Sequence, residues 1–314
     1  MTYALVTGAA GFVASHLVDT LLARGCRVRG VDCLTPYYPA SIKRDNLARA
    51  LEHPDFEFIE DDLNRLDLDR LLDGVDVVFH LAGQPGVRSS WAANFAAYLE
   101  HNVLATQRLL DAAARRQVRR LVFASSSSVY GEQPALPVRE DAVGRPASPY
   151  GVTKLACEHL CRLYAESFGV PTVVLRYFTI YGPRQRPDMA VYRVIRAAHT
   201  GSSFARYGDG GQVRDFTFVG DAVAATVAAG IRPLPPGTVL NIAGGSVTTL
   251  AEVVALVAEV VGRQVSVAHA AAQPGDVART GASTERARQL LEWSPTVGLR
   301  EGIKAQVDWQ LAGG

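Results

Sequence analysis

The chain has 314 residues, of which 48% are hydrophobic, so it can bury one large core or two smaller ones. Its formal net charge of +1 gives none of the bulk basicity that nucleic-acid or acidic-membrane partners favour, and we expect neither partner. No apolar run approaches the length of a membrane span, and the N-terminus shows no basic leader or small-residue cleavage site.

The predicted elements alternate between strand and helix from the N-terminus onward. Short apolar runs predict strands at residues 3–7, 27–31, 56–59, 75–81, 120–124 and 172–176. Apolar spacing predicts helices at residues 12–24, 102–115 and 149–168. Because the strands are nearly continuous apolar runs, the pattern is typical of a parallel sheet covered by helices on both faces. We therefore predict an α/β fold with a doubly wound parallel sheet.

The alternation weakens after about residue 177, where Gly, Pro and Arg become dense in GPRQRPDM. We interpret this change as the start of a smaller α/β lobe that binds the substrate. The segment VRDFTFVGDAVAATVAAG is expected to return to the large lobe. The predicted division is a large lobe of residues 1–176 and about 212–240, and a small lobe of residues 177–211 and 241–314.

A glycine-rich turn, GAAG, joins the first predicted strand to the first predicted helix. Gly8 allows a tight turn, and Gly11 allows the backbone to approach a pyrophosphate bound at the helix N-terminus. The third position of this Rossmann-type pattern is Ala14, where helix–strand packing often tolerates a methyl group. Asp32 follows about 20 residues later, where a carboxylate accepts from both ribose hydroxyls, although a solvated strand-end acid is the alternative. Since Asp32 would repel a 2′-phosphate, we expect NAD rather than NADP.

Tyr150 and Lys154 form a Tyr-x-x-x-Lys pattern, and their i, i+4 spacing places both side chains on one face of the predicted helix. A phenol with a pKa of about 10 is a poor base at neutral pH, so a nearby ammonium and a cationic nicotinamide are needed to favour the phenolate. The pattern also occurs by chance in helices. Here it follows four serines, residues 125–128, at the end of a predicted strand, where open α/β sheets bind ligands.

Lysine occurs only at positions 43, 154 and 304, so each lysine suggests a specific need for an ammonium group. The four cysteines, Cys26, Cys33, Cys157 and Cys161, form no CxxC pattern, and no histidine follows them at zinc-ligand spacing. We therefore predict no metal site. Cys157 and Cys161 are one helical turn apart and are expected to be buried thiols, which fits a reducing cytoplasm.

Six segments together resemble the extended short-chain dehydrogenase/reductases that modify nucleotide sugars: TGAAGFVAS, HLAGQPGVR, SSSSVYG, SPYGVTK, LRYFTIYGPRQRPDM and YGDGGQVRDFTFVGD. The resemblance covers essentially the whole chain and implies an NAD-dependent enzyme with a UDP-sugar substrate. It implies that Tyr150 is the base, Lys154 its electrostatic partner and ribose ligand, and Ser126 a hydroxyl bonded to the reacting oxygen. It also implies a homodimer formed through the helices around Asn102 and Tyr150, whose apolar positions could equally belong to the core.

The same resemblance implies two further sets of ligand-binding residues. The set around NAD is Gly8, Gly11, Phe12, Val13, Asp32, Lys43, Asp62, Leu63, Leu81, Ala82, Gly83, Gln84, Ala124, Tyr150, Lys154 and Tyr177. The set around the UDP-sugar is Arg88, Ser126, Ser127, Ser128, Tyr150, Thr179, Arg186, Arg193, Phe204, Arg214 and Asp276. Within these sets, Lys43 is equally compatible with an exposed lysine. Gln273 stands where many relatives have Arg, which puts one phosphate contact in doubt.

Subfamilies of this family differ in the residues after the catalytic hydroxyl. Dehydratases have an Asp-Glu pair there and UDP-glucuronate decarboxylases a Glu, whereas this chain has Ser127 and Ser128. This difference argues against both reactions and favours 4-epimerisation. Arg88, Thr179 and Arg186 are similar to residues of UDP-glucuronate 4-epimerases, so we favour UDP-glucuronate as the substrate. The alternatives are a UDP-glucose or UDP-N-acetylglucosamine 4-epimerase and, less favoured, a decarboxylase or a non-catalytic NAD-binding sensor.

Overall fold

The computed structural model describes residues 2–208 and 210–313, and its main element is a seven-stranded parallel sheet. The strand order is β10-β6-β5-β4-β1-β2-β3, and every neighbouring pair runs parallel. The strands are β1 (Tyr3–Thr7), β2 (Arg27–Asp32), β3 (Phe56–Glu60), β4 (Val77–His80), β5 (Arg120–Ser126), β6 (Thr172–Tyr177) and β10 (Thr238–Ile242). The predicted α/β fold is confirmed.

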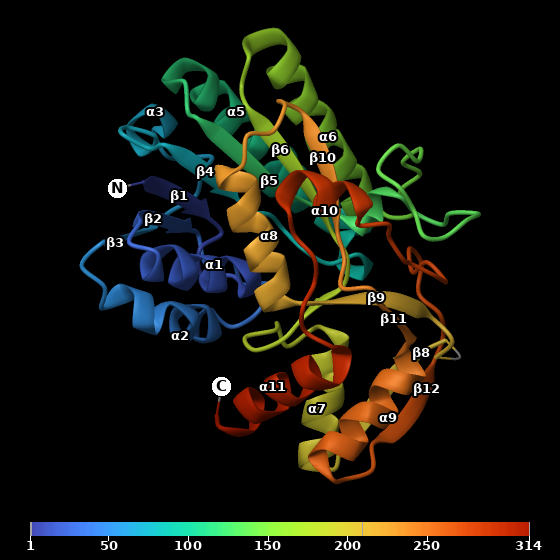
Figure 1. The fold of residues 1–314 in the computed structure, drawn as a ribbon. Coiled ribbons are helices and arrows are strands. Elements are labelled where there is room, and N and C mark those ends of the chain that lie inside the picture. The colour runs from blue at the N-terminus through green and yellow to red at the C-terminus, as the bar shows by residue number, and fades with distance from the viewer. Residues whose placement is uncertain (1, 209, 314) are drawn as a thin grey trace.

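Helices cover both faces of this sheet (Figure 1). One face carries α1 (Phe12–Ala23), α2 (Ala40–Leu51) and α8 (Val219–Ile231), and the other carries α3 (Leu68–Leu71), α5 (Ala105–Arg116) and α6 (Pro149–Phe168). A separate apolar cluster fills each of the two layers, so the strands are buried on both sides. This double burial explains why the strands are nearly continuous apolar runs rather than alternating ones.

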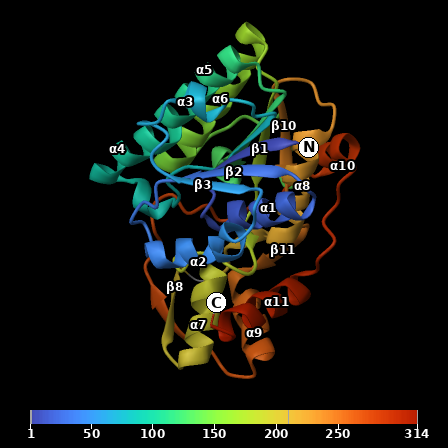
Figure 2. The same ribbon diagram turned by 90° about the vertical axis from the view of Figure 1, so that its left-hand side faces the viewer.

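A smaller lobe lies below the sheet in Figures 1 and 2. Its helices α7 (Ala190–Thr200), α9 (Leu250–Val261) and α11 (Leu299–Leu311) share an apolar cluster. Its strands form a pair, β8 (Ser203–Tyr207) with β12 (Ser266–Ala270), and a three-stranded sheet of β11 (Ser246–Thr249), β9 (Val213–Phe218) and β7 (Ile180–Tyr181). Two further short α-helices among the described residues are α4 (Phe95–Tyr98) and α10 (Glu285–Leu291).

The chain crosses between the lobes more often than the predicted ranges allow. Within residues 212–240, β9 pairs in the three-stranded sheet, whereas α8 and β10 pack in the large lobe. Helix α10 also packs against β10 and α8, although its residues fall in the range predicted for the small lobe. We therefore propose a modified division, with β9 in the small lobe and α10 in the large one.

Helix α6 begins and ends where the sequence predicts, because both ends carry local signals. The Ser148 Oγ accepts a hydrogen bond of 3.1 Å from the Gly151 N–H, and Gly169 ends the helix at φ 68°. The predicted helix 102–115 differs more, since a π-helix over Leu99–Leu104 precedes α5. A π-helix adds a residue to the turn and changes the direction of the side chains beside it.

Five large apolar side chains on these helices are exposed: Leu99, Leu104, Val152, Leu163 and Phe168. They are not core residues, so they are available to a partner subunit, and the homodimer stays a prediction. No helix within residues 2–208 or 210–313 combines the length and the apolar composition that crossing a bilayer requires.

Candidate active site

A cavity of about 820 Å³ lies between the two lobes, at the carboxyl ends of β1, β2, β4, β5 and β6. Ligands of open α/β sheets bind at this edge, because the order of the strands reverses there and opens a crevice. Every residue predicted to contact NAD or substrate lines this cavity except Phe204, which lines a smaller cavity of about 150 Å³. Which ligand atom each of these residues contacts stays a prediction.

The glycine-rich turn after β1 leaves no room for a side chain. Gly8 has φ 70°, and a Cβ atom there would lie 2.8 Å from the backbone of Ala82. A Cβ atom on Gly11 would lie 3.0 Å from the Gly8 carbonyl oxygen, and Gly11 begins α1 without a side-chain cap. The first N–H groups of α1 are therefore free to bind an anion such as a diphosphate.

Asp32 lies at the end of β2 and is held in place by backbone donors. Its carboxylate accepts from Leu34 N at 2.8 Å and from Ala10 N at 3.2 Å. Burial raises the pKa of Asp32, and the Lys43 ammonium 3.9 Å away partly offsets this rise. Lys43 is itself buried and donates to the Thr35 carbonyl oxygen at 3.0 Å, so the alternative of an exposed lysine is wrong. The site therefore fits a dinucleotide with a free ribose 2′-hydroxyl, because it combines the glycine turn, the N-terminus of α1 and the Asp32 carboxylate.

Tyr150, Lys154 and Ser126 lie at the other end of the dinucleotide half of the cavity. The buried Lys154 ammonium donates to the Ala124 carbonyl oxygen at 2.8 Å and lies 4.9 Å from the centroid of the Phe123 ring. The Ser126 Oγ accepts from Ser128 N at 3.1 Å and donates to the Ser128 Oγ at 3.1 Å. The arrangement thus brings a phenol, an ammonium and a hydroxyl to one cavity wall, where they can exchange a proton with a bound alcohol.

Asn102, in the π-helix, connects the cofactor loop to the catalytic helix. Its Oδ1 accepts from Gln84 N at 2.7 Å, and its Nδ2 donates to the Gln84 carbonyl oxygen at 3.2 Å and the Thr153 Oγ1 at 3.0 Å. The sequence indicated Asn102 only as a helix residue. The π-helix that directs its amide to Gln84 has no signal in the local sequence.

A buried histidine lies behind the cofactor loop. His80 Nδ1 pairs with the Thr7 Oγ1 at 2.7 Å, and Nε2 pairs with the Thr106 Oγ1 at 3.0 Å. Because Thr106 already donates to the Asn102 carbonyl oxygen at 2.6 Å, it accepts from His80 Nε2–H. Burial, helped by the Lys154 charge, lowers the pKa of His80 to about 3. His80 is therefore a neutral structural residue at physiological pH.

A buried ion pair lies beside the serine cluster and is hydrogen-bonded to its first member, Ser125. The Arg176 guanidinium contacts the Glu158 carboxylate through Nε at 3.0 Å and Nη2 at 2.7 Å. The Ser125 Oγ donates to the same carboxylate at 2.5 Å, and the Tyr130 hydroxyl accepts from Arg176 Nη1 at 2.7 Å. This network fixes the end of β5, from which Ser126 enters the cavity.

Side chains of both lobes meet over the substrate half of the cavity. Arg88 Nη2 contacts the Asp276 Oδ2 at 2.7 Å, and its guanidinium lies 4.0 Å from the centroid of the Tyr207 ring. Arg214 lines the same wall. Tyr207 was not predicted, because a tyrosine that ends a short strand carries no distinctive sequence signal. Gln273 donates to the Ala271 carbonyl oxygen and lines neither cavity.

Phe204 is buried in the apolar core of the small lobe, and the Arg193 guanidinium lies 5.4 Å from its ring centroid. Its predicted contact with the UDP-sugar stays a prediction, because Phe204 lines only the smaller cavity.

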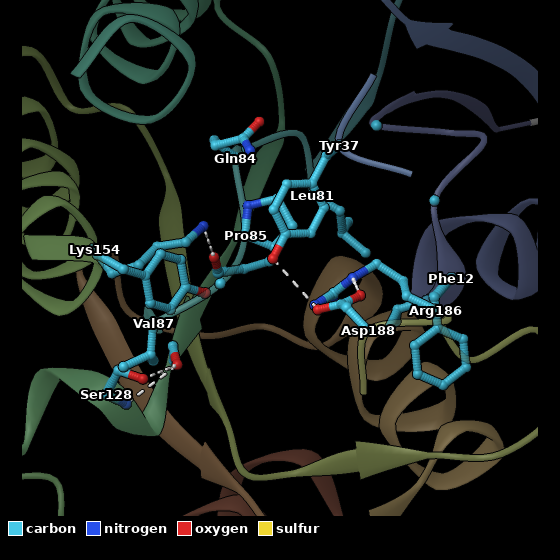
Figure 3. Close-up of a pocket in the computed structure, with 18 of the residues that line it drawn as sticks. Phe12, Tyr37, Leu81, Gln84, Pro85, Val87, Ser128, Lys154, Arg186 and Asp188 are labelled. Atoms are coloured by element: carbon cyan, nitrogen blue, oxygen red, sulfur yellow. Dashed lines mark hydrogen bonds and ion pairs between the residues drawn. The ribbon is translucent and has the colours of Figure 1, made fainter. Parts of the chain in front are cut away.

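The two arginines of GPRQRPDM have different partners. Arg184 pairs with Asp19 of α1 at 2.8 Å, which gives it a structural role. Arg186 lines the cavity and pairs with Asp188 through Nε at 2.9 Å and Nη2 at 3.0 Å. Figure 3 shows Arg186 beside Phe12 and Tyr37, on the opposite side of the pocket from Ser128.

One cluster of metal-ligand residue types occurs among the described residues. Atoms of Cys33, Asp62 and His101 lie within 4.8 Å of one another, a proximity that sequence spacing did not indicate. All three line the end of the cavity predicted for adenosine, so they belong to the cofactor site. Cys157 and Cys161 are buried free thiols, as predicted.

The model of the NAD dependent epimerase/dehydratase family matches residues 4–243, which is most of the chain. The chain belongs to this family. The resemblance inferred from the sequence and the expectation of NAD as cofactor are thereby confirmed.

Individual relatives are similar over nearly their whole length. The Bacillus subtilis protein YtcB, named as a UDP-glucose epimerase, is 43% identical, with 96% of each chain covered. A UDP-glucuronate 4-epimerase of Thermodesulfobacterium geofontis is 34% identical, with 98% of this chain and 96% of the relative covered. The Bacillus cereus UDP-glucuronic acid 4-epimerase, solved with UDP-glucuronic acid and NAD, is 40% identical with a TM-score of 0.97, and both chains are covered completely.

Proposed function

We propose that this NAD-dependent UDP-sugar 4-epimerase converts UDP-glucuronate to UDP-galacturonate through a 4-keto intermediate. The observation that carries the proposal is the group of hydroxyls that line the cavity, Ser127, Ser128 and Thr179, of which the two serines stand where dehydratases and decarboxylases have acids. Hydroxyl groups can bind a sugar carboxylate without adding a second negative charge. The similarity to the Bacillus cereus enzyme with its bound UDP-glucuronic acid supports the same substrate.

In this proposal Tyr150 takes the proton from the C4 hydroxyl and later returns it. Lys154, one helical turn away, favours the phenolate and donates to the cofactor ribose. Ser126 hydrogen-bonds the C4 oxygen and so holds it close to the phenol. The glycine turn, Asp32 and Lys154 would hold NAD, which would supply the hydride acceptor for C4 and, when reduced, the donor.

Oxidation at C4 creates a hazard that the site must control. The 4-keto intermediate is a β-keto acid, and such an acid loses CO₂ readily when its C5–C6 bond lies perpendicular to the plane of the C4 carbonyl group. We propose that Ser127, Ser128, Thr179 and Arg186 hold the carboxylate away from that alignment, which is catalysis by positioning. The absence of a Glu at position 128 supports retention of the carboxylate.

A neutral-sugar 4-epimerase is the second candidate, and one observation favours it. The Arg186 charge is already compensated by Asp188, so the cavity does not require an acidic sugar at that point. The name of YtcB points in the same direction.

The test is incubation with NAD and either UDP-glucuronate or UDP-glucose, with products identified by mass spectrometry after chromatography. We expect UDP-galacturonate with little CO₂. Arg186→His and Thr179→Ala should raise the share of decarboxylated 4-keto-pentose, whereas Arg263→His, outside the cavity, should not. Turnover of UDP-glucose without turnover of UDP-glucuronate would overturn the substrate assignment. Loss of activity in both variants without added decarboxylation would overturn the positioning role alone.

A further inference from the structure

The loop that carries Arg186 is anchored on both sides. The Pro183 carbonyl oxygen pairs with His16 Nε2 at 2.9 Å, and Arg184 pairs with Asp19 on the same helix, α1. The buried Gln185 accepts from Tyr192 N at 2.8 Å through its Oε1 and donates to the Ile180 carbonyl oxygen at 3.1 Å. These contacts fix the backbone of the loop up to residue 185. Arg186 can therefore move chiefly by rotation of its side chain.

The Arg186 side chain contacts Tyr37 and Asp188, and we call this pair of residues the arginine dock. Asp188 binds the Nε and Nη2 edge of the guanidinium with both carboxylate oxygens. The Tyr37 hydroxyl donates to the Asp188 Oδ2 at 3.4 Å, and its ring centroid lies 5.8 Å from the guanidinium carbon. Figure 3 shows this group at the side of the pocket away from Ser128.

The arginine dock holds Arg186 in the way that a uronate substrate would. A sugar carboxylate presents the same planar pair of oxygens as Asp188, and the Nε–Nη2 edge cannot bind both groups at once. The Tyr37 hydroxyl remains bonded to Asp188 when the arginine leaves, which lowers the cost of uncovering that carboxylate. The pair is only partly buried, with 19% of the Arg186 side chain and 36% of the Asp188 side chain exposed, so exchange of partners is feasible.

We infer that Asp188 is a specificity-determining residue that competes with the sugar carboxylate for Arg186. This inference rests on the proposed function. A uronate that binds through the Nε–Nη2 edge must draw Arg186 from the dock, whereas a neutral hexose leaves the pair intact. Asp188 thus weakens binding of UDP-glucuronate relative to UDP-glucose, and it allows the cavity to hold either sugar without an unpaired cation.

The test compares affinities in a Tyr150→Phe background, where turnover does not disturb the measurement. Calorimetric titration of the NAD-saturated protein gives the Kd of UDP-glucuronate and of UDP-glucose. Asp188→Asn should lower the ratio of the UDP-glucuronate Kd to the UDP-glucose Kd about two- to fivefold. This is the change in affinity that the free energy of a partly exposed ion pair corresponds to. Tyr37→Phe should instead raise this ratio slightly, because the carboxylate that Arg186 leaves behind then lacks the Tyr37 hydrogen bond. Glu259→Gln, which removes a carboxylate from a bidentate pair with Arg300 outside the cavity, is the matched control.

A ratio that is unchanged in Asp188→Asn overturns the inference, and so does a ratio that rises, because Asp188 would then orient Arg186 for the sugar. A higher affinity for NAD with an unchanged ratio also overturns it and would assign Arg186 to the cofactor diphosphate. The proposed function fails separately, if the protein with Tyr150 intact converts UDP-glucose but not UDP-glucuronate.

Discussion

Replacement of Glu158 by glutamine tests whether the buried ion pair beside the serine cluster stabilises the fold. Only 6% of the Glu158 side chain and 8% of the Arg176 side chain are exposed. The Glu158→Gln variant would leave the guanidinium charge buried and uncompensated, a loss that typically costs about 3–5 kcal/mol. With an unfolding entropy of about 2.1 cal/mol/K per residue over 314 residues, the melting temperature should fall by roughly 5–8 °C.

The same helix offers a matched control. Glu166 of α6 pairs with Arg162 at 3.8 Å, and about two thirds of each side chain is exposed. Glu166→Gln should therefore cost less than about 0.5 kcal/mol. The assay is thermal unfolding followed by circular dichroism, with Arg176→Met added to Glu158→Gln as a double variant. The double variant should recover part of the loss, because it removes the uncompensated charge. Equal melting temperatures for the two single Glu→Gln variants would refute the reasoning.

Three further predictions concern chemistry, cofactor and pH. Tyr150→Phe should keep the fold and NAD binding but lower kcat at least about 10²-fold; retention of more than about a tenth of kcat would exclude Tyr150 as the base. NAD should bind at least about tenfold more tightly than NADP in fluorescence titrations, and equal affinities would show that Asp32 does not face the ribose. Burial and the Lys154 charge lower the pKa of His80 to about 3, whereas an unfolded histidine titrates near about 6.5. The free energy of unfolding should therefore fall as the pH drops below about 6.5, by about 2 kcal/mol at pH 5 in urea titrations, and His80→Asn should lose this part of the pH dependence.

Local sequence signals were sufficient wherever an element is defined by its own ends. Helix α6 has a serine cap, a proline in the first turn and a terminal glycine, and its predicted bounds are correct. The turn from Gly8 to Gly11 was identifiable because larger residues are excluded there: a Cβ atom would meet the backbone of Ala82 at Gly8 and the Gly8 carbonyl oxygen at Gly11. Six strands of the seven-stranded sheet followed from apolar runs that burial on both faces requires, whereas β10 was not predicted.

The remaining features depend on contacts between distant parts of the chain. Helix α2 was not predicted, because Pro39 offers no side-chain cap and its charged residues obscure the apolar spacing. Arg88 and Asp276 pair across 188 positions of sequence, and no local pattern connects them. Tyr37 was also missed, since its role depends on the loop around Asp188 that closes against it. The sequence was enough to place Arg186 in the cavity but not to identify its partner.

The burial of two of the three lysines has a practical consequence for labelling. Lys43 and Lys154 are enclosed beside the cofactor cavity, whereas about two thirds of the Lys304 side chain on α11 is exposed. Amine-reactive dyes, cross-linkers or solid supports should therefore modify the lysines of the folded protein at this one position. Lys304 lies outside the cavity, so a fluorophore attached there leaves the ligand-binding walls untouched. The fold thus leaves one lysine side chain available for immobilisation or fluorescence labelling without any cysteine engineering.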